Sequence, residues 1–501
     1  MILKRKLPSP ITILMGVIIL AALSTWLIPA GKYNTLGYTE GNSFKYSIAG
    51  KDSSLPFTQQ TLDKLKINIS LDKFKSGAIR KPVSVPGSYQ QLPSDKQSIL
   101  KVLQAPVKGI YDSVDIVFFI LIIGGFMQIF NESGAMVKGL SALSYRMKGK
   151  EAWLIIILTF LFSFAGSSYG MAEEALVFYP VLVPIFLAAG YDLIVPVAVI
   201  FAGTQLGTLS SFTNPFSTII ASNAAGVNWS DGLIERIIMF VITTVITIWY
   251  IVKYANRIKK NPQASYVYKT DGHVASPYPG LLTTDHVYAP LDTKTKLLLL
   301  LFLSTFLVMI GGVVFFEWWL LEMTTLFLAS AILLAIVLRM KETDFIAAFI
   351  KGAQSLLSVA LIVGVARGVT VILNEGHISD SIIFYAANLV STMPPALFIV
   401  MMLVLYMLFT LFISSTSGMA VLTMPIMGAL AVLVNVPGRE IVNAYLFGMG
   451  IMGFITPTGL ILPSLALVNI SIKAWLRFIY PLLIILFIVC ALCLVVGIYY
   501  K

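Results

Sequence analysis

The stretch FAGSSYGMAEEALVFYPVLVPI, residues 164–185, points to the kind of fold this chain adopts. It places two adjacent carboxylates, Glu173 and Glu174, inside an apolar run, directly after a cluster of serine and glycine. The run 153–189 around it is too long for one helix and is cut by its glycines, so we predict a hairpin that enters and leaves the same side of a membrane. A carboxylate at membrane depth is costly and usually functional.

The composition excludes an ordinary soluble protein. The chain has 501 residues, of which 57% are hydrophobic and 12% charged, whereas soluble domains carry about 25% charged residues. Many apolar runs approach 20 residues, the length of a spanning helix. We therefore predict an all-α polytopic membrane protein. The net charge of +11 then indicates cytoplasmic loops facing anionic lipid, and not nucleic acid.

Three features of the sequence argue against an enzyme or a pump. The histidines fall in polar connections without metal-ligand spacing, so no in-membrane catalytic centre is expected. There is no Gly-rich loop ending in Lys-Ser or Lys-Thr for ATP. Cys490 and Cys493 have redox-type spacing, but they lie in the last apolar run and are interpreted as small packing residues.

Basic residues predict the organisation of the chain. Lysine and arginine at positions 4–6 precede the first apolar run and place the N-terminus in the cytoplasm. The expected segments are a first transmembrane helix (1–30), an extracytoplasmic polar segment (31–110), repeat 1 (111–252), a cytoplasmic linker (253–293) and repeat 2 (294–501). Each repeat is expected to hold scaffold helices, a hairpin (152–189 and 395–434) and a broken helix (193–225 and 440–470).

An internal repeat underlies this division. Residues 170–172 (GMA) recur at 418–420, an offset of 248 that Gly190 and Gly438 share. Upstream, residues 125, 131 and 132 match 368, 374 and 375 at an offset of 243. From the positions of lysine and arginine, we expect the first hairpin to open to the cytoplasmic side and the second to the opposite side. The repeats are therefore predicted to be inverted, as in secondary transporters.

The broken helices supply candidate binding groups. In GTLSSFTNPFSTIIASNAAG (207–226), Thr213 or Asn214 can cap a new half-helix; in FITPTGLILPSLALVNI (454–470), Thr456 can do so. A helix that begins at membrane depth presents free N–H groups to an anion. The alternative is two proline-kinked helices whose hydroxyls bond to their own carbonyls.

The hairpin tips, residues 166–170 and 414–418, are rich in hydroxyl groups that could bind a carboxylate, a sodium ion or both. The alternative is that these small residues only allow tight packing. Only the first repeat has the two glutamates; the matching positions are Val421 and Leu422. Helix N-termini would thus hold a substrate carboxylate, while a glutamate holds an amino or guanidinium group. Two alternatives stay open: a glutamate that carries a proton, and a structural ion pair with Arg367.

The candidate site residues follow from these features. The predicted substrate-binding residues are Ser167, Ser168, Glu173, Glu174, Thr213, Asn214, Asn223, Ser415, Thr416, Ser417, Thr456 and Thr458. The candidate sodium ligands are Ser168, Thr213, Asn214, Ser415 and Thr456. No cofactor is expected beyond Na⁺ or H⁺ as the coupling ion.

Five stretches resemble the C4-dicarboxylate anaerobic carrier family, in particular its YfcC-like branch within the ion transporter superfamily. They are WLIPAGKY (26–33), SSYGMAEEALVFYP (167–180), SFTNPFSTI (211–219), ISSTSGMAVLTMPI (413–426) and FITPTGLIL (454–462). The resemblance implies a homodimer in the bacterial plasma (inner) membrane. Each subunit would have a static scaffold and a moving domain that holds both hairpins, an elevator mechanism.

The resemblance also bears on substrate and ion. The family motif has asparagine where this chain has Ser168 and Ser415 or Thr416, which weakens the expectation of sodium coupling. The family name suggests dicarboxylates, whereas YfcC-like members are labelled basic amino acid antiporters. The expected function is an elevator-type antiporter of small carboxylate-bearing solutes, foremost amino acids such as arginine and ornithine. The alternative is a sodium- or proton-coupled C4-dicarboxylate carrier.

Overall fold

The computed structural model describes residues 9–39, 43–48, 51–67, 69–75, 82–136, 138–139, 142, 150–168, 170–267, 291–316, 318 and 320–499. Within these ranges, eight helices are long and apolar enough to cross a membrane. Their outward faces expose large apolar side chains, for example Ile234, Val245 and Trp249 on α12 (Leu233–Lys260). Such a surface is suited to lipid and not to water, so the chain is a multi-pass membrane protein. The basic residues at 4–6, hairpin-tip residue 169 and linker residues 268–290 lie outside the described residues.

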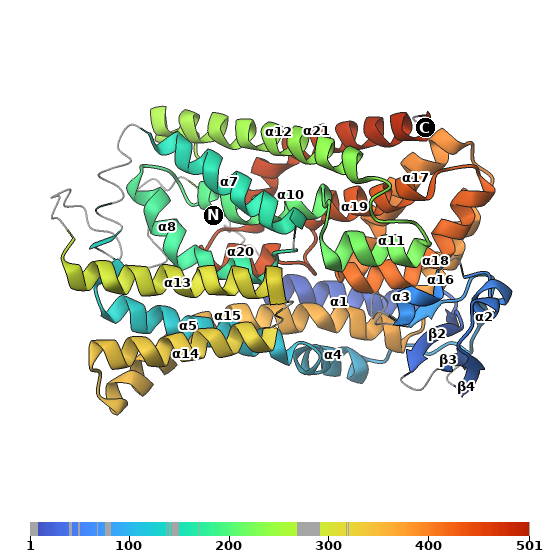
Figure 1. Ribbon diagram of the computed structural model, residues 1–501, viewed down its shortest axis with the longest axis horizontal. Helices are drawn as coiled ribbons and strands as arrows, with labels where there is room; N and C mark the ends of the chain where they lie inside the picture. Colours follow the sequence, from blue (N-terminus) through green and yellow to red (C-terminus); the bar gives the residue numbers. More distant parts are fainter. Residues whose placement is uncertain are drawn as a thin grey trace, which may run out of the picture.

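The helices form two layers, one above the other in Figure 1. The lower layer, here called the α15 layer, contains α1 (Pro10–Leu27), α4 (Ile99–Tyr111), α5 (Val114–Glu132), α13 (Thr293–Phe316), α14 (Leu320–Leu338) and α15 (Glu342–Glu375). The upper layer, here called the hairpin layer, contains α7 (Glu151–Ser168), η1 (Glu173–Phe178), α8 (Tyr179–Ala188), α9 (Ile194–Val197), η2 (Ala198–Ala202), α10 (Gly203–Leu209), η3 (Pro215–Ile219), α11 (Ile220–Ala225), α12, α17 (Pro395–Phe412), α18 (Thr416–Leu433), α19 (Gly438–Gly453), α20 (Ile461–Leu467) and α21 (Ile472–Tyr499). A short 3-10 turn, η4 (Pro262–Ala264), follows α12.

Within the α15 layer, α4 and α5 pack one after the other along α15. A Cβ on Gly109 of α4 would lie 2.4 Å from the carbonyl oxygen of Gly364, and a Cβ on Gly124 of α5 would lie 2.5 Å from that of Gly352. The two glycines therefore let the backbones approach closely. Because Gly109 meets the later part of α15 and Gly124 the earlier part, the helices run antiparallel. Between α4 and α5 the chain kinks at Asp112.

The hairpin layer contains two hairpins and two broken helices. After α7 the chain turns at Gly170, whose φ of +88° suits glycine, and returns through η1 and α8. The second hairpin is α17 and α18, joined by residues 413–415. Helical structure stops at Leu209 and resumes at Pro215; it stops again at Gly453 and resumes at Ile461. These breaks fall within the stretches that the sequence singled out.

The all-α prediction is wrong for residues 31–91, which contain strands. They are β1 (Gly31–Lys32), β2 (Thr35–Thr39), β3 (Ser43–Ile48), β4 (Lys51–Pro56), β5 (Val83–Ser84) and β6 (Gln90–Gln91), with the short helices α2 (Gln59–Lys64) and α3 (Leu71–Lys75). An antiparallel sheet has the order β4-β3-β2-β5, with Leu36 opposite Tyr46 and Phe44 opposite Leu55. Apolar and polar residues alternate along β2 and β3, so Leu36 and Phe44 are buried on one face. The strands are only two to six residues long, which is too short for this period to be recognised from the sequence.

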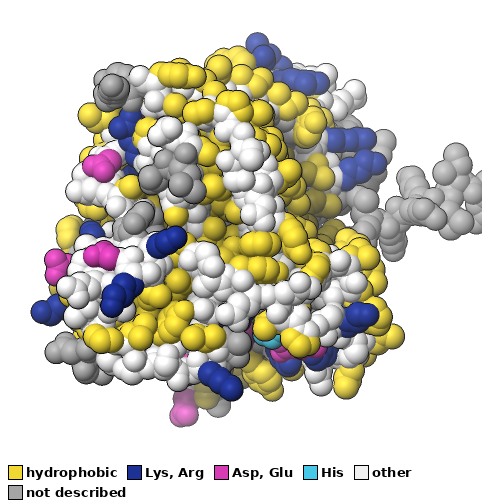
Figure 2. All heavy atoms as spheres, turned by 90° about the vertical axis from the view of Figure 1, so that its right-hand side faces the viewer, with side chains coloured by type: hydrophobic (Ala, Val, Ile, Leu, Met, Phe, Trp, Pro, Cys, Tyr) yellow, Lys and Arg dark blue, Asp and Glu magenta, His cyan; other side chains and the backbone are white. Residues whose placement is uncertain are grey.

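The described residues of the segment 31–91, here called the cap, are docked on α16 (Ser379–Val390). The Tyr33 N–H donates to Asp380 Oδ2 at 2.9 Å, and the Tyr89 ring stacks on Phe384 with 4.0 Å between centroids. Figure 2 looks onto this end of the molecule, where charged side chains are dispersed among apolar ones. Residues 99–110 are not part of the cap, because α4 belongs to the α15 layer.

Candidate functional site

A cavity of about 290 Å³ lies between the two layers. The α15 layer lines it with Asp112, Asp115, Ile116, Leu320, Val363, Ala366 and Arg367. The hairpin layer lines it with Gly170, Ala172, Glu173, Glu174, Gln205, Thr208, Phe216, Thr410, Ser414, Ser415, Thr416, Ser417, Met449, Gly453, Thr456, Thr458, Gly459 and Leu460. Both hairpin tips reach the cavity, as do segments beside both helix breaks. We therefore take it as the candidate binding site.

The cavity contains more acidic than basic groups. Asp112 and Asp115 come from the kink between α4 and α5, Glu173 and Glu174 come from the first hairpin, and Arg367 comes from the middle of α15. Four carboxylates thus face one guanidinium. Charges interact strongly where protein and lipid replace water, so the site favours a ligand that brings positive charge.

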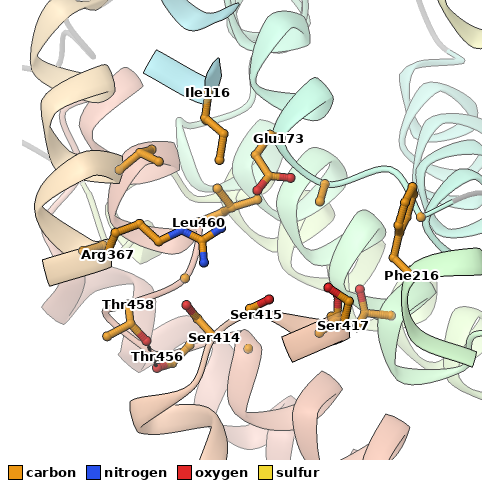
Figure 3. Close-up of a pocket in the computed structure, with 18 of the residues that line it drawn as sticks. Ile116, Glu173, Phe216, Arg367, Ser414, Ser415, Ser417, Thr456, Thr458 and Leu460 are labelled. Carbon is orange, nitrogen blue, oxygen red and sulfur yellow. Dashed lines mark hydrogen bonds between the residues drawn. The ribbon is translucent and has the colours of Figure 1, made fainter. Parts of the chain in front are cut away.

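The first hairpin positions its two glutamates differently. Gly170 cannot be replaced without a clash, because a Cβ there would lie 2.7 Å from Asn214 Oδ1. The chain then enters η1, where Glu174 is buried and its Oε2 accepts the N–H of Ala172 at 2.9 Å. Glu173 neither accepts a hydrogen bond nor forms an ion pair among the described residues. In Figure 3 its carboxylate reaches into the cavity.

Arg367 is the cation of the opposite wall. It sits half-buried on α15 beside Val363 and Ala366, and its guanidinium points into the cavity in Figure 3. In the described part of the chain, it donates no hydrogen bond and forms no ion pair within 4.0 Å. The structural ion pair that the sequence allowed between Arg367 and a glutamate is therefore not formed in this structure.

The second hairpin tip presents a helix N-terminus to the cavity. Ser415 caps α18: its Oγ accepts the N–H of Gly418 at 3.2 Å, and its carbonyl accepts that of Met419 at 2.9 Å. Ser414, Thr416 and Ser417 flank this cap and line the cavity. The helix dipole makes this end partly positive, which suits a carboxylate.

The second helix break lies against this tip. Thr456 Oγ1 donates to the carbonyl of Thr410 at 3.3 Å and pairs with Thr458 Oγ1 at 3.1 Å. Thr458 Oγ1 in turn donates to the carbonyl of Leu411 at 3.4 Å. These bonds satisfy carbonyls at the end of α17, so both threonines line the cavity while fixing the hairpin to the break.

At the first hairpin the predicted hydroxyls point elsewhere. Ser167 Oγ donates to the carbonyl of Ser210 at 2.8 Å, and Thr213 Oγ1 donates to that of Ser168 at 3.0 Å. Asn214 Nδ2 donates to the carbonyl of Gly166 at 3.1 Å, and its Oδ1 caps η3. Ser168 Oγ bonds within its own helix. None of these four predicted residues lines the cavity; they bind the tip to the helix break.

Asn223 is the fifth predicted residue outside the cavity lining. It lies in α11 and is buried, and neither atom of its amide has a hydrogen-bond partner among the described residues. Seven of the twelve predicted residues do line the cavity: Glu173, Glu174, Ser415, Thr416, Ser417, Thr456 and Thr458.

The five candidate sodium ligands divide between two places. Ser168, Thr213 and Asn214 lie at the first tip, whereas Ser415 and Thr456 line the cavity. Over the ranges that the structure describes, no group of three or more His, Cys, Asp or Glu residues could hold a metal. A sodium site stays a prediction.

The residues that sequence reasoning missed come mostly from the α15 layer. Asp112 and Asp115 were given no role, because residues 31–110 were assigned to a polar segment and α4 was not expected there. Arg367 was considered only as the ion-pair partner of a glutamate, and Gln205 was not noticed. Two aspartates three positions apart at the junction of two apolar helices were the available signal.

Comparison with known proteins bears on this site. Residues 7–499 match the family model described as "C4-dicarboxylate anaerobic carrier". The chain belongs to this family. It is a family of transporters and not of enzymes, as the resemblance of the motifs implied.

Two relatives of this carrier family align over nearly all of the chain. An uncharacterized protein of Haemophilus influenzae is 38% identical over 494 residues, 98% of this chain and 97% of that protein. The Escherichia coli protein named "Putative basic amino acid antiporter YfcC" is 29% identical over 500 residues, 96% of this chain and 94% of that protein.

Two solved structures are similar at 14% identity. The YdaH transporter of Alcanivorax borkumensis has a TM-score of 0.40, covering 98% of each chain. MtrF of Neisseria gonorrhoeae, described with a class of antimetabolite efflux pumps, has a TM-score of 0.38, covering 99% of this chain and 96% of that one.

Proposed function

We propose that this carrier is a secondary active antiporter of basic amino acids such as arginine and ornithine. The charge pattern of the cavity carries the proposal. A basic amino acid has two cationic groups and one carboxylate; Glu173 and Glu174 would take a cationic group, and the N-terminus of α18 with Ser415 and Ser417 would take the carboxylate. The name of the E. coli relative agrees with this substrate class.

The size of the cavity agrees with a small solute. At about 290 Å³, its volume is just below the range of about 300 to 1,000 Å³ that is typical of small-molecule sites. A single amino acid suits such a volume, whereas a peptide or nucleotide does not.

We further propose that the two halves are inverted repeats. At the offset of 243, Gly109 corresponds to Gly352 (352 − 109 = 243), and Gly124 to Arg367 (367 − 124 = 243). Gly109 lies against Gly364, near Arg367, while Gly352 lies against Gly124. The contact that Gly109 makes near Arg367 is thus matched by the contact that Gly352 makes with Gly124, and the helices involved run antiparallel. A two-fold axis in the membrane plane would produce this relation.

The ends of α12 support the same proposal. Asp192 and Glu440 are equivalent at the offset of 248 (440 − 192 = 248). Asp192 accepts the hydroxyl of Tyr254 near the C-terminal end of α12. Glu440 bonds to Asn443, which accepts from Arg236 near the N-terminal end. Equivalent acids at opposite ends of one spanning helix are expected of inverted repeats.

An elevator movement would then carry the substrate. The groups proposed to bind it, Glu173, Glu174 and the tip of α18, all belong to the hairpin layer. That layer would move against a static α15 layer, which would form a homodimer in the bacterial inner membrane with the N-terminus cytoplasmic. Exchange of one basic amino acid for another needs no coupling ion, whereas net uptake would use Na⁺ or H⁺.

A C4-dicarboxylate carrier is the second candidate. Arg367 and the N-terminus of α18 favour it, because each suits a carboxylate. The four carboxylates of the cavity disfavour it, because a dicarboxylate would add two negative charges to them.

A thermal-shift screen of the detergent-purified protein separates the two. We expect arginine and ornithine to raise the melting temperature, and succinate and fumarate to leave it unchanged, each with and without sodium. Stabilisation by ligand follows from binding to the folded state alone. The reverse pattern would establish the dicarboxylate carrier and reject the amino acid proposal.

A further inference from the structure

Arg367 and Glu173 face each other across the boundary between the layers. Arg367 projects from α15, and Glu173 projects from the first hairpin. Neither has a hydrogen bond or ion pair with any residue that the structure describes. Two unpaired, opposite charges therefore line one cavity, each mounted on a different layer.

Helix packing does not require an arginine at position 367. Its equivalent in the first repeat is Gly124, whose lack of a side chain lets the carbonyl of Gly352 approach. The guanidinium of Arg367 is directed away from the helix contacts and into the cavity. An unpaired charge in such a place is costly unless it serves a function.

We propose that Arg367 acts as a latch that makes this carrier an obligatory exchanger, an inference that rests on the proposed function. This structure shows the two side chains apart, with the latch open. In the latched, substrate-free state, the long side chain of Arg367 swings onto Glu173 and ties the hairpin layer to the α15 layer. The cationic group of a bound substrate takes Glu173 instead and releases Arg367. Only a loaded hairpin layer can then move.

The energetic reasoning follows from the charges of the cavity. Without substrate, Glu173 and Glu174 are held close together with no cation in contact, and pairing with Arg367 relieves this repulsion. Asp112 and Asp115 lie on the same wall as Arg367 and do not tie the layers together, because they belong to the α15 layer. A substrate can shift the latch only because it competes for the same carboxylate.

Transport measurements in proteoliposomes test the latch directly. The wild type should take up labelled arginine into vesicles loaded with arginine, and far less into empty vesicles. Arg367→Gln should raise uptake into empty vesicles by about tenfold or more while retaining exchange. Lys351→Gln, an exposed change on the same helix, should behave as wild type. Loss of both uptake and exchange in Arg367→Gln would mean that Arg367 binds the substrate carboxylate, and unchanged uptake into empty vesicles would equally reject the latch.

A second measurement needs no substrate, so it separates failure of the latch from failure of the proposed function. Dyes are placed at Lys341→Cys beside α15 and Lys473→Cys on α21, in a Cys490→Ala and Cys493→Ala background, and single-molecule energy transfer is followed. Without substrate, the wild type should hold one distance. In Arg367→Gln and in Glu173→Gln, the distance between the dyes should fluctuate between two values. A wild type that fluctuates as freely as the variants would overturn the latch, whatever the substrate proves to be.

Discussion

At the first hairpin tip, the hydroxyls of Ser167 and Thr213 are bonded to backbone carbonyls of the tip and of the helix break, and the carboxylates of Glu173 and Glu174 line the cavity. At the second tip, Ser415 and Ser417 line the cavity, and no carboxylate accompanies them. Similar sequences at equivalent positions thus supply opposite charge: the first tip is negative, and the second offers the positive end of a helix dipole.

This division suits a ligand that is itself polarised. A symmetric anion would bind two similar tips equally well, whereas an amino acid with a cationic side chain has one end for each. The difference between the tips, more than either tip alone, therefore favours the proposed substrate class. Four variants would break or sharpen this comparison, in order of expected effect.

The largest effect is expected at the first tip, from Glu173→Gln. The change removes the charge that pairs with the substrate cation and leaves the shape of the side chain nearly intact. Arginine should bind more weakly by about 2 to 3 kcal/mol, about 30- to 160-fold, as measured by calorimetry on purified protein. Glu132→Gln, at the exposed end of α5, serves as the matched control. Undiminished arginine binding in Glu173→Gln would show that the first tip does not bind the cation.

The next effect should appear in stability and not in selectivity, from Asn214→Ala. Asn214 bonds to Gly166 and caps η3 through the N–H groups of Phe216 and Ser217. Its loss leaves buried groups unpaired and should destabilise the fold by about 1 to 3 kcal/mol. Thermal unfolding should show the loss, while the ratio of arginine to succinate binding stays the same. A changed ratio would mean that Asn214 contacts substrate.

A smaller effect is expected at the second tip, from Ser415→Ala. The variant loses the cap of α18, which typically costs about 1 kcal/mol, and should weaken binding of the substrate carboxylate about fivefold. Ser168→Ala, the comparable change at the first tip, should have little effect, because that hydroxyl bonds only within its own helix. Equal effects of the two variants on arginine affinity would abolish the distinction between the tips.

How far the sequence predicts this molecule depends on the kind of signal. Long apolar runs predict the membrane helices, because length and hydropathy are local properties. The stretches around 210–214 and 454–460 are non-helical in the structure, where proline and hydroxyl residues interrupt the pattern. The strands of the cap were missed because they are short.

The site was harder to predict than the helices. The residues of the hairpin layer that line the cavity carry a motif, whereas Asp112, Asp115 and Arg367 reach the cavity only through the packing of α4 and α5 on α15. Residue type alone also could not show that Ser167 and Asn214 would turn to backbone carbonyls. That choice depends on tertiary contacts between segments about 45 residues apart.

The smallest effect concerns the pH dependence of stability at Asp192, which accepts the hydroxyl of Tyr254 near the C-terminal end of α12. Burial raises the pKa of Asp192 above the usual range, although hydrogen bonds from Ser265, Tyr254 and the N–H groups of Val195 and Ile194 oppose the shift. An acid whose pKa is raised by folding binds its proton more tightly in the folded state. The contribution of Asp192 to the free energy of unfolding therefore falls as pH rises from the pKa of the unfolded state through the pKa of the folded state.

Asp192→Asn keeps an oxygen that can accept the N–H groups at the start of α9, but it cannot ionise. The melting temperature of the wild type relative to this variant should therefore be highest in acid and should decline as pH rises from about 4 towards neutrality. Thermal unfolding curves of the wild type and of Asp192→Asn, recorded in pairs across this pH range, would measure the difference in melting temperature. A difference that instead grew with pH would mean that the hydrogen bonds from Tyr254 and Ser265 outweigh burial, so that this end of α12 prefers a charged acid.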